Sequence, residues 1–259
     1  MSDRSRRPQK PLRGHVLLDD KTQRRLRRIR WRRIGVTLAA VAVIAGAVAF
    51  YQSPLLRVQK VEVTGASGVD AAEVRRLAAF EGDSMFRLDL AGVNERIAYL
   101  PLVQSVQIER RWPQTVRIRI TERTPWGYWQ VGAVSYVIDG EGVVLPATAA
   151  PDGAPAIKDL GNPVRLVPGD HVDLDAVRLT QALAQRVPET LQMAIAALEY
   201  SPATGLTVTT DAGYRVVVGD SQNMDYKMAV WQAIETQLGR EEMAGHVLDL
   251  RFGDRPSFQ

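Results

Sequence analysis

The feature that most constrains the fold of this 259-residue chain is one uninterrupted apolar run. It extends from Ile34 to Tyr51 and reads IGVTLAAVAVIAGAVAFY, eighteen residues without a charged side chain. As a helix rising about 1.5 Å per residue it spans roughly 27 Å, close to the bilayer hydrocarbon thickness of about 30 Å. The alternative, a buried core helix, usually keeps polar residues along one stripe. The run therefore predicts a transmembrane helix over 34–51.

Charge is distributed unevenly on the two sides of this run. The whole chain carries 33 Lys+Arg against 29 Asp+Glu, but residues 1–33 alone hold 13 and 3, which leaves 20 and 26 for the rest. Eight of the basic residues lie within 14–33, whereas residues 52–71 contain two. The positive-inside rule then predicts that the N-terminal side is cytoplasmic and that residues 52–259 are exported.

Two export signals are alternatives to an uncleaved anchor. Ala47-Val48-Ala49 resembles a signal-peptidase site, but the basic region is too long for a cleaved signal and the apolar run exceeds the usual 7–15 residues. Arg32-Arg33 resembles a twin-arginine signal, but the exported part has no cofactor motif that requires folding before export. An uncleaved anchor is therefore preferred.

The basic segment 1–33 is rich in Arg, Pro, Gln and Ser, and its composition predicts a largely disordered cytoplasmic tail. Nucleic-acid binding is an alternative, since Lys and Arg neutralise phosphates. The anionic membrane leaflet accounts for the same charges at about 1 kcal/mol per residue. We therefore interpret the tail as a topology determinant and expect no nucleic acid as a partner. The lipid bilayer is expected as a partner through the one transmembrane helix.

Residues 57–125 are predicted to form a compact first exported domain. A short strand is expected at Val61–Gly65, because Val61 and Val63 share one face. Asp70 begins a predicted helix with a capping-box-like pattern, and a second helix from Asp89 is stopped by Pro101. Two alternating strands follow, around Val106–Ile108 and Val116–Ile120, joined by a turn at Trp112-Pro113-Gln114. The predicted order is β-α-α-β-β.

Four short motifs occur in order along this domain. They are Val61-Glu62-Val63-Thr64-Gly65, Leu100-Pro101-Leu102-Val103, Arg110-Arg111-Trp112-Pro113 and Glu122-Arg123-Thr124-Pro125. Directly after an anchor with a basic tail, they resemble the POTRA (polypeptide-transport-associated) domain of the FtsQ/DivIB family of bacterial cell-division proteins. The resemblance implies that the signature residues are structural: Gly65, Pro101, Arg110, Trp112, Pro113, Glu122 and Pro125. An indole before a turn proline is also more often a packing residue than a ligand contact.

Residues 126–259 are predicted to form a second exported domain, made mostly of β-structure. Strands are expected for WGYWQV, VSYVID and VVLPA, with Asp139-Gly140-Glu141-Gly142 as a hairpin turn and residues 146–155 as a loop. A helix at 174–186 precedes strands at 195–200, 206–210 and 214–218. Met224, Met228, Trp231, Ile234 and Leu238 then recur at helical spacing, which indicates a core-packing helix, with a methionine-lined groove as the alternative. A last strand is predicted at 247–252.

The same family carries a mixed, mostly antiparallel β domain with helices after its POTRA domain, so the implied fold class is α+β over the whole chain. VIDGEGVVL and VLDLRF are similar to the family's hairpin and terminal-strand motifs. In that family the last strand is the edge on which the small coiled-coil division proteins FtsB and FtsL dock. The resemblance therefore implies partner binding by Leu250, Arg251 and Phe252, through main-chain pairing and side-chain anchoring. The alternative is that Phe252 only caps the core.

No catalytic or ligand-binding motif is present in the sequence. Without cysteine, thiol and iron–sulfur chemistry are excluded, and His15, His171 and His246 lack metal-ligand spacing. No P-loop, G-x-S-x-G or S-x-x-K motif occurs. We therefore expect no enzyme activity, no cofactor, no metal and no small-molecule substrate.

The leading hypothesis is a non-enzymatic, single-pass scaffold of the division machinery. It lies in the bacterial inner membrane with its domains in the periplasm, and it links early and late division proteins at the septum. Two alternatives remain: a periplasmic POTRA-type chaperone or transport adaptor that binds strands by β-augmentation, and a cell-wall hydrolase, which would need convergent carboxylates or a metal.

Overall fold

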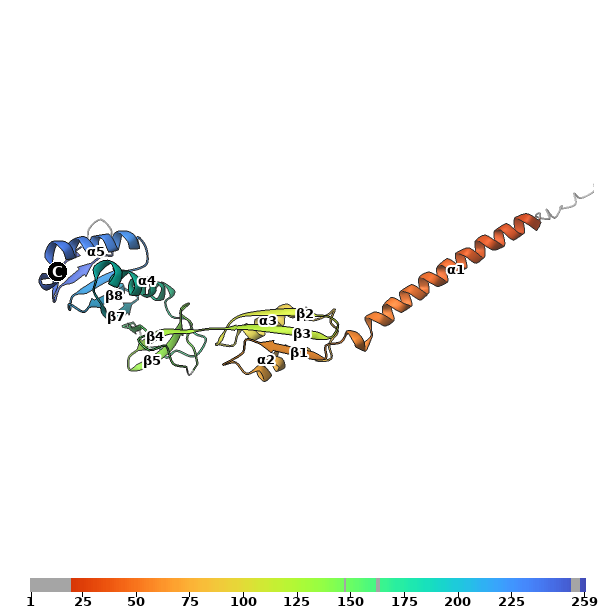
Figure 1. Ribbon diagram of the computed structural model, residues 1–259, viewed down its shortest axis with the longest axis horizontal. Helices are drawn as coiled ribbons and strands as arrows, with labels where there is room; N and C mark the ends of the chain where they lie inside the picture. Colours follow the sequence, from red (N-terminus) through yellow and green to blue (C-terminus); the bar gives the residue numbers. More distant parts are fainter. Residues whose placement is uncertain (1–19, 147, 162–163, 253–256) are drawn as a thin grey trace, which may run out of the picture. The chain divides into compact units, whose positions relative to one another are not determined.

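A computed structural model describes residues 20–146, 148–161, 164–252 and 257–259 of the chain (Figure 1). The chain divides into two units, residues 1–56 and residues 57–259. The second unit contains two separate hydrophobic cores, one drawn from residues 58–120 and one from residues 129–250. Each core defines one domain of the second unit.

The first unit is dominated by one long helix, α1 (Asp20–Tyr51), followed by the short 3-10 helix η1 (Pro54–Leu56). Within α1, Trp31–Tyr51 is long and apolar enough to cross a membrane. The helix begins earlier than the predicted span, so residues 20–33 are helical where a largely disordered tail was expected. Gln, Lys, Arg and Leu are good helix formers, and they extend a helix that the apolar run has already nucleated. The rest of the predicted tail, residues 1–19, lies outside the described residues.

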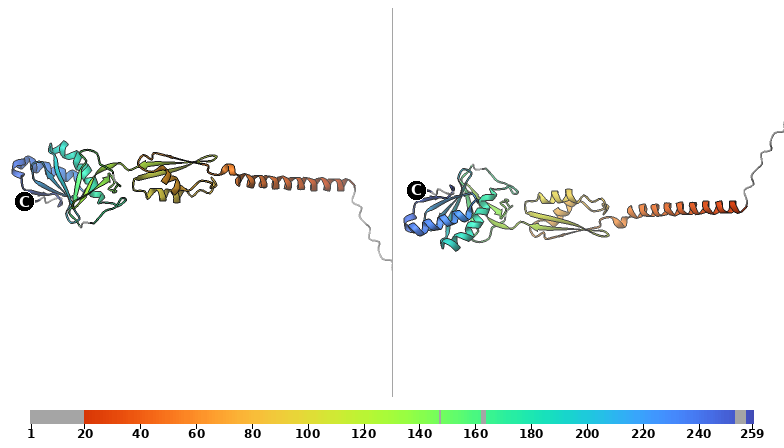
Figure 2. Two further views of the ribbon diagram at one scale, coloured as in Figure 1. Left: turned by 90° about the horizontal axis from the view of Figure 1, so that it is seen from below. Right: turned by 90° about the horizontal axis from the view of Figure 1, so that it is seen from above.

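The first domain of the second unit has the predicted β-α-α-β-β order. Its elements are β1 (Lys60–Thr64), α2 (Ala71–Ala78), α3 (Leu90–Ala98), β2 (Val103–Arg111) and β3 (Thr115–Glu122). The strands form a three-stranded sheet in the order β1-β3-β2, with β1 parallel and β2 antiparallel to β3. The two helices lie on one side of this sheet (Figure 2).

Both helices of this domain begin at a capping aspartate. The side chain of Asp70 accepts from the Ala72 N–H at 2.8 Å, and that of Asp89 accepts from the Gly92 N–H at 3.0 Å. Each bond satisfies a backbone donor that the helix itself cannot pair. The second helix ends at Ala98, before Pro101, as expected for a chain approaching a proline.

The alternation of side chains along β3 explains how this sheet packs against its helices. Val116, Ile118 and Ile120 are buried on the helix side. On the other side Arg117 pairs with Glu62 of β1 at 3.2 Å, and Arg119 donates to Gln107 of β2 at 3.3 Å. The strand period of two therefore puts an apolar face inward and a row of cross-strand polar pairs outward.

Within its described residues, the second domain contains an eight-stranded sheet and three helices. Its strands are β4 (Pro125–Val131), β5 (Val134–Asp139), β6 (Ala156–Asp159), β7 (Ile195–Ser201), β8 (Gly205–Thr210), β9 (Arg215–Gly219), β10 (Val247–Asp249) and β11 (Ser257–Phe258). Its helices are α4 (Leu174–Leu191), α5 (Met224–Leu238) and α6 (Arg240–Met243). The strand order across the sheet is β11-β10-β9-β8-β7-β6-β4-β5.

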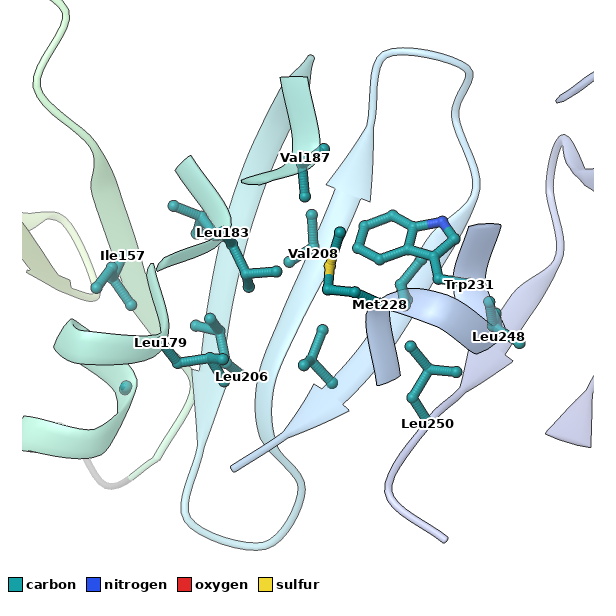
Figure 3. Close-up of a cluster of buried hydrophobic side chains, with 14 of the residues drawn as sticks. Ile157, Leu179, Leu183, Val187, Leu206, Val208, Met228, Trp231, Leu248 and Leu250 are labelled. Atoms are coloured by element: carbon teal, nitrogen blue, oxygen red, sulfur yellow. The ribbon is translucent and has the colours of Figure 1, made fainter. Parts of the chain in front are cut away.

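This sheet is mixed. β4–β6, β6–β7 and β9–β10 are parallel pairs, and β4–β5, β7–β8, β8–β9 and β10–β11 are antiparallel. The buried side chains of α4 and α5 face the strands, where Leu179, Leu183 and Trp231 meet Leu206 and Val208 (Figure 3). The methionines of α5 belong to this packing, since Met228 is in the same cluster.

Three details of the second domain differ from the sequence predictions. The predicted strand VVLPA forms only isolated bridges, at Val143 and Val144. The last predicted strand, 247–252, ends as β10 at Asp249. The sheet also contains two strands that the sequence did not reveal, β6 and β11. Both are short, with four and two residues, so neither shows a measurable alternation.

Candidate functional site

The three residues predicted to bind a partner lie directly after β10, and the structure gives them different environments. Leu250 is 3% exposed and packs in the core of the domain (Figure 3). Its N–H donates to the Val217 carbonyl of β9 at 2.9 Å. The side chain of Leu250 therefore anchors the end of β10 to the domain, and it is not presented to solvent.

Arg251 is held in place by a carboxylate two residues before it. Its Nε lies 3.0 Å and 3.1 Å from the two oxygens of Asp249, and its Nη2 lies 2.6 Å from Oδ2. The Asp249 carboxylate also accepts the backbone N–H of Arg251 at 3.0 Å. This side-chain pairing with Arg251 lowers the pKa of Asp249 below its usual value and raises the pKa of Arg251. The guanidinium is thus fixed in one orientation at the protein surface.

Phe252 is the exposed member of the group, with 59% of its surface accessible. The Arg251 guanidinium lies over its ring, 5.1 Å from the centroid, a cation–π contact. The other side of the Arg251 side chain lies on Gly219, where an added Cβ would come within 2.8 Å of the Arg251 Cγ. Arg251 and Phe252 therefore form a preorganised cationic and aromatic surface beside the end of β10.

The outer side of β10 is covered by β11, and this corrects the expectation that the last predicted strand is the edge of the sheet. Leu248 is opposite Phe258, and Asp249 is opposite Ser257. The Val247 N–H donates to the Gln259 carbonyl at 2.7 Å, and the Gln259 N–H donates to the Val247 carbonyl at 3.0 Å. The edge position therefore belongs to β11.

Arg251 also lines a surface cavity of about 320 Å³ that contains three aspartates, Asp173, Asp175 and Asp220. Each carboxylate already has partners in the protein. Tyr200 and the Ala176 N–H donate to Asp173, Ser221 donates to Asp175, and Lys227 pairs with Asp220 at 2.9 Å. Burial, together with the bond to Asp173, raises the pKa of Tyr200 to about 12. Within the described ranges no group of three His, Cys, Asp or Glu side chains is arranged to hold a metal ion.

The signature residues of the first domain have structural environments. A Cβ at Gly65, whose φ is +81°, would lie 2.1 Å from the Ile120 carbonyl oxygen, so the end of β1 requires glycine. Glu122 Oε1 accepts the backbone N–H groups of three consecutive residues at 2.7, 2.8 and 2.9 Å: Ser67, Gly68 and Val69. Glu122 thereby ties the loop after β1 to the end of β3.

The remaining signature residues mark turns and junctions. Trp112 is 52% exposed, packs on Phe86 with ring centroids 5.0 Å apart, and precedes the cis-bonded Pro113. Arg110 donates to the Leu88 carbonyl at 3.2 Å. Pro101 follows α3, and Pro125 is the first residue of β4.

Two residues at the candidate site were not singled out from the sequence. Asp249 fixes Arg251, and the signal for it was available, since residues two apart on a strand point to the same side. His246 stacks on Phe258, with ring centroids 5.0 Å apart and an interplanar angle of 17°. The pairing of His246 with Phe258 depends on β11 and had no sequence signal.

Family comparisons cover both domains of the second unit. Residues 56–123 match the family model of the POTRA domain, FtsQ-type, and residues 127–251 match that of the cell division protein FtsQ/DivIB, C-terminal. The second match ends at Arg251, so β11 lies beyond the part of the chain that the family model describes.

Curated relatives agree with the family models. The chain is 30% identical over 199 residues to the cell division protein FtsQ of Chloroflexus aggregans, covering 75% of this chain and 73% of that protein. It is 29% identical over 211 residues to the protein of the same name from Corynebacterium glutamicum, covering 80% and 89%. A third, from Streptomyces bingchenggensis, is 31% identical over 211 residues, covering 78% of each.

Proposed function

This chain belongs to the FtsQ/DivIB family of cell-division proteins, and from that premise we propose that it is a non-enzymatic scaffold of the divisome. It is a single-pass membrane protein anchored by α1, with residues 1–33 in the cytoplasm and residues 52–259 in the periplasm. At the septum it links early and late division proteins through its exported domains, and its partners there are coiled-coil proteins of the FtsB and FtsL type.

The observation that carries this proposal is the surface formed by Arg251 and Phe252 beside β10. An exposed aromatic ring with a preoriented guanidinium is the composition that dominates binding energy at protein interfaces. The end of a mixed sheet next to it supports recognition by strand addition, in which main-chain bonds give affinity and side chains give specificity. Leu250 contributes by fixing the position of this surface from the core.

Substitution of the two exposed residues tests the site. Phe252→Ala and Arg251→Glu are each expected to abolish co-purification of the FtsB- and FtsL-type partners with the detergent-extracted chain. Tyr226→Ala and Arg76→Glu serve as matched controls, because Tyr226 is an exposed aromatic residue of α5 and Arg76 an exposed arginine of α2. Normal recovery of partners with both site variants would contradict the proposal that the interface lies on this surface.

A second candidate is a periplasmic chaperone or transport adaptor, favoured by β2, which forms one edge of the three-stranded sheet. The localisation of the protein in the cell and the effect of its depletion distinguish the two candidate functions. A divisome scaffold is expected at midcell, and cells depleted of it are expected to form filaments. Diffuse envelope localisation with normal division would instead support the adaptor.

A further inference from the structure

The two-residue strand β11 uses the outer backbone groups of β10, next to the proposed docking surface. Val247 exchanges both of its main-chain hydrogen bonds with Gln259, at 2.7 and 3.0 Å. The backbone groups of His246 and Leu250 point to the opposite side, toward β9. The His246 carbonyl accepts from the Arg215 N–H at 3.0 Å, and the Leu250 N–H donates to the Val217 carbonyl at 2.9 Å. β10 is therefore engaged on both sides, by β9 and by β11.

A backbone N–H or C=O group in a ladder pairs with one neighbouring strand on a given side. A partner segment that adds to β10 would need the Val247 groups that Gln259 now uses. It would also displace Phe258 from its stack on His246. Occupancy of the outer side of β10 by β11 and by a partner strand is consequently mutually exclusive.

We infer that β11 is an intramolecular competitor that covers the partner-binding side of β10, and that an extended segment of the partner replaces it on binding. The inference rests on the proposed function, because it concerns regulation of that same surface. Competition lowers the apparent affinity to the intrinsic affinity multiplied by the fraction of molecules in which β11 is released.

The size of β11 makes such a replacement feasible. Its pairing consists of the Leu248–Phe258 and Asp249–Ser257 positions and the reciprocal bonds of Val247 with Gln259, supplemented by one ring stack. A partner strand longer than two residues would form more ladder bonds on the same side. Arg251 and Phe252 lie immediately after this stretch, so a longer strand would reach them as well.

A pair of substitutions at one position isolates the competing bond. Gln259→Pro removes the N–H that donates to Val247, whereas Gln259→Ala retains it. Both variants keep Phe258, Arg251 and Phe252. A third chain, ended after Phe252, lacks β11 altogether. All are prepared as the membrane-anchored chain in lipid nanodiscs and titrated with the purified exported segments of the FtsB- and FtsL-type proteins.

The first measurement is hydrogen exchange at the Val247 amide in the absence of partner. Exchange is expected to accelerate in Gln259→Pro and in the chain ended after Phe252, and to remain unchanged in Gln259→Ala. Unaltered exchange in the chain ended after Phe252, which lacks the Gln259 carbonyl that accepts from Val247, would overturn the inference, because β11 would then not protect β10.

The second measurement is partner affinity. Gln259→Pro and the shortened chain are expected to bind about 3- to 30-fold more tightly than Gln259→Ala, as expected when a weakly held competitor is removed. Equal affinities, or weaker binding by the shortened chain, would overturn the inference while leaving the proposed function intact; the weaker binding would mean that the partner adds to β11 itself. Absence of binding by every chain would overturn both.

Discussion

At the scale of single residues, one carboxylate holds the loop that follows β1. Glu122 accepts three backbone N–H groups, and removing its charge is expected to weaken all three bonds at once. Glu122→Gln should destabilise the first domain by about 1–3 kcal/mol, measured by urea denaturation of the purified chain. Glu109→Gln is the control, since Glu109 forms an ion pair with Arg111 at the protein surface. Equal stability of the two variants would contradict a bonding role for Glu122.

Replacing Gly65 and replacing Gly82 by alanine are expected to lower the free energy of unfolding for different reasons. Both have a positive φ, +81° and +86°, but only at Gly65 would a Cβ strike the backbone, 2.1 Å from the Ile120 oxygen. Gly82→Ala is expected to cost about 1 kcal/mol of unfolding free energy, the conformational term alone. Gly65→Ala should cost more than about 2 kcal/mol and shift the urea midpoint further. Similar midpoints would mean that β3 moves to accommodate the methyl group.

The pairing of Asp249 with Arg251 predicts a pH dependence of stability. Because Arg251 lowers the folded pKa of Asp249, the folded state binds this proton less readily than the unfolded state, in which the pKa is about 3.9. The stabilising contribution, about 1 kcal/mol, is present above pH ~4 and is lost as the pH falls through the folded pKa. Unfolding midpoints from pH 6 to pH 2 should therefore converge for the wild type and Asp249→Asn. A constant difference over this range would contradict the linkage.

How far single residues were predictable depended on whether their partners lie nearby in the sequence. The cap at Asp70, the helix start at Asp89 and the turn at Trp112 were predicted, because they depend on residues within a few positions. The partners of Glu122 lie more than fifty residues away, so its role was implied by family resemblance alone. Leu250 was grouped with two exposed neighbours, although strand alternation already indicates that one of three successive residues differs in burial.

At the scale of elements, β6 connects the two parts of the large sheet. It is parallel to both β4 and β7, and its Ile157 is fully buried between them. Ile157→Ala is expected to lower the unfolding free energy of the second domain by about 2–5 kcal/mol. Lys158→Ala, an exposed neighbour on the same strand, should change it by less than about 0.5 kcal/mol. Chemical denaturation measures both, and an Ile157→Ala midpoint equal to that of Lys158→Ala would show that the sheet does not depend on β6.

The elements recovered from the sequence are those with enough length for a periodic pattern. The helices from Asp89, Leu174 and Met224 each show apolar residues at helical spacing over several turns, and the strands of the first domain alternate clearly. β6 and β11 contain too few residues for a period to be read, and their pairing is set by strands far away in the sequence. The predicted VVLPA strand fails for the opposite reason, because an apolar run is present but pairs only through isolated bridges.

At the scale of the whole molecule, the charge difference across α1 predicts the topology. Residues 14–33 contain eight Lys and Arg residues and residues 52–71 contain two, so the positive-inside rule predicts that the N-terminal side is cytoplasmic. A reporter active only in the periplasm should therefore function when fused after Gln259 and remain inactive when fused at Ser5. Replacing the six basic residues within 14–30 by Gln, while leaving Trp31–Tyr51 intact, should increase activity of the Ser5 fusion, because the span remains and most of its orientation signal is lost. A reporter active at Ser5 and silent after Gln259 in the unmodified chain would reverse the topology and place the Arg251 and Phe252 surface in the cytoplasm, where periplasmic partner segments do not reach it.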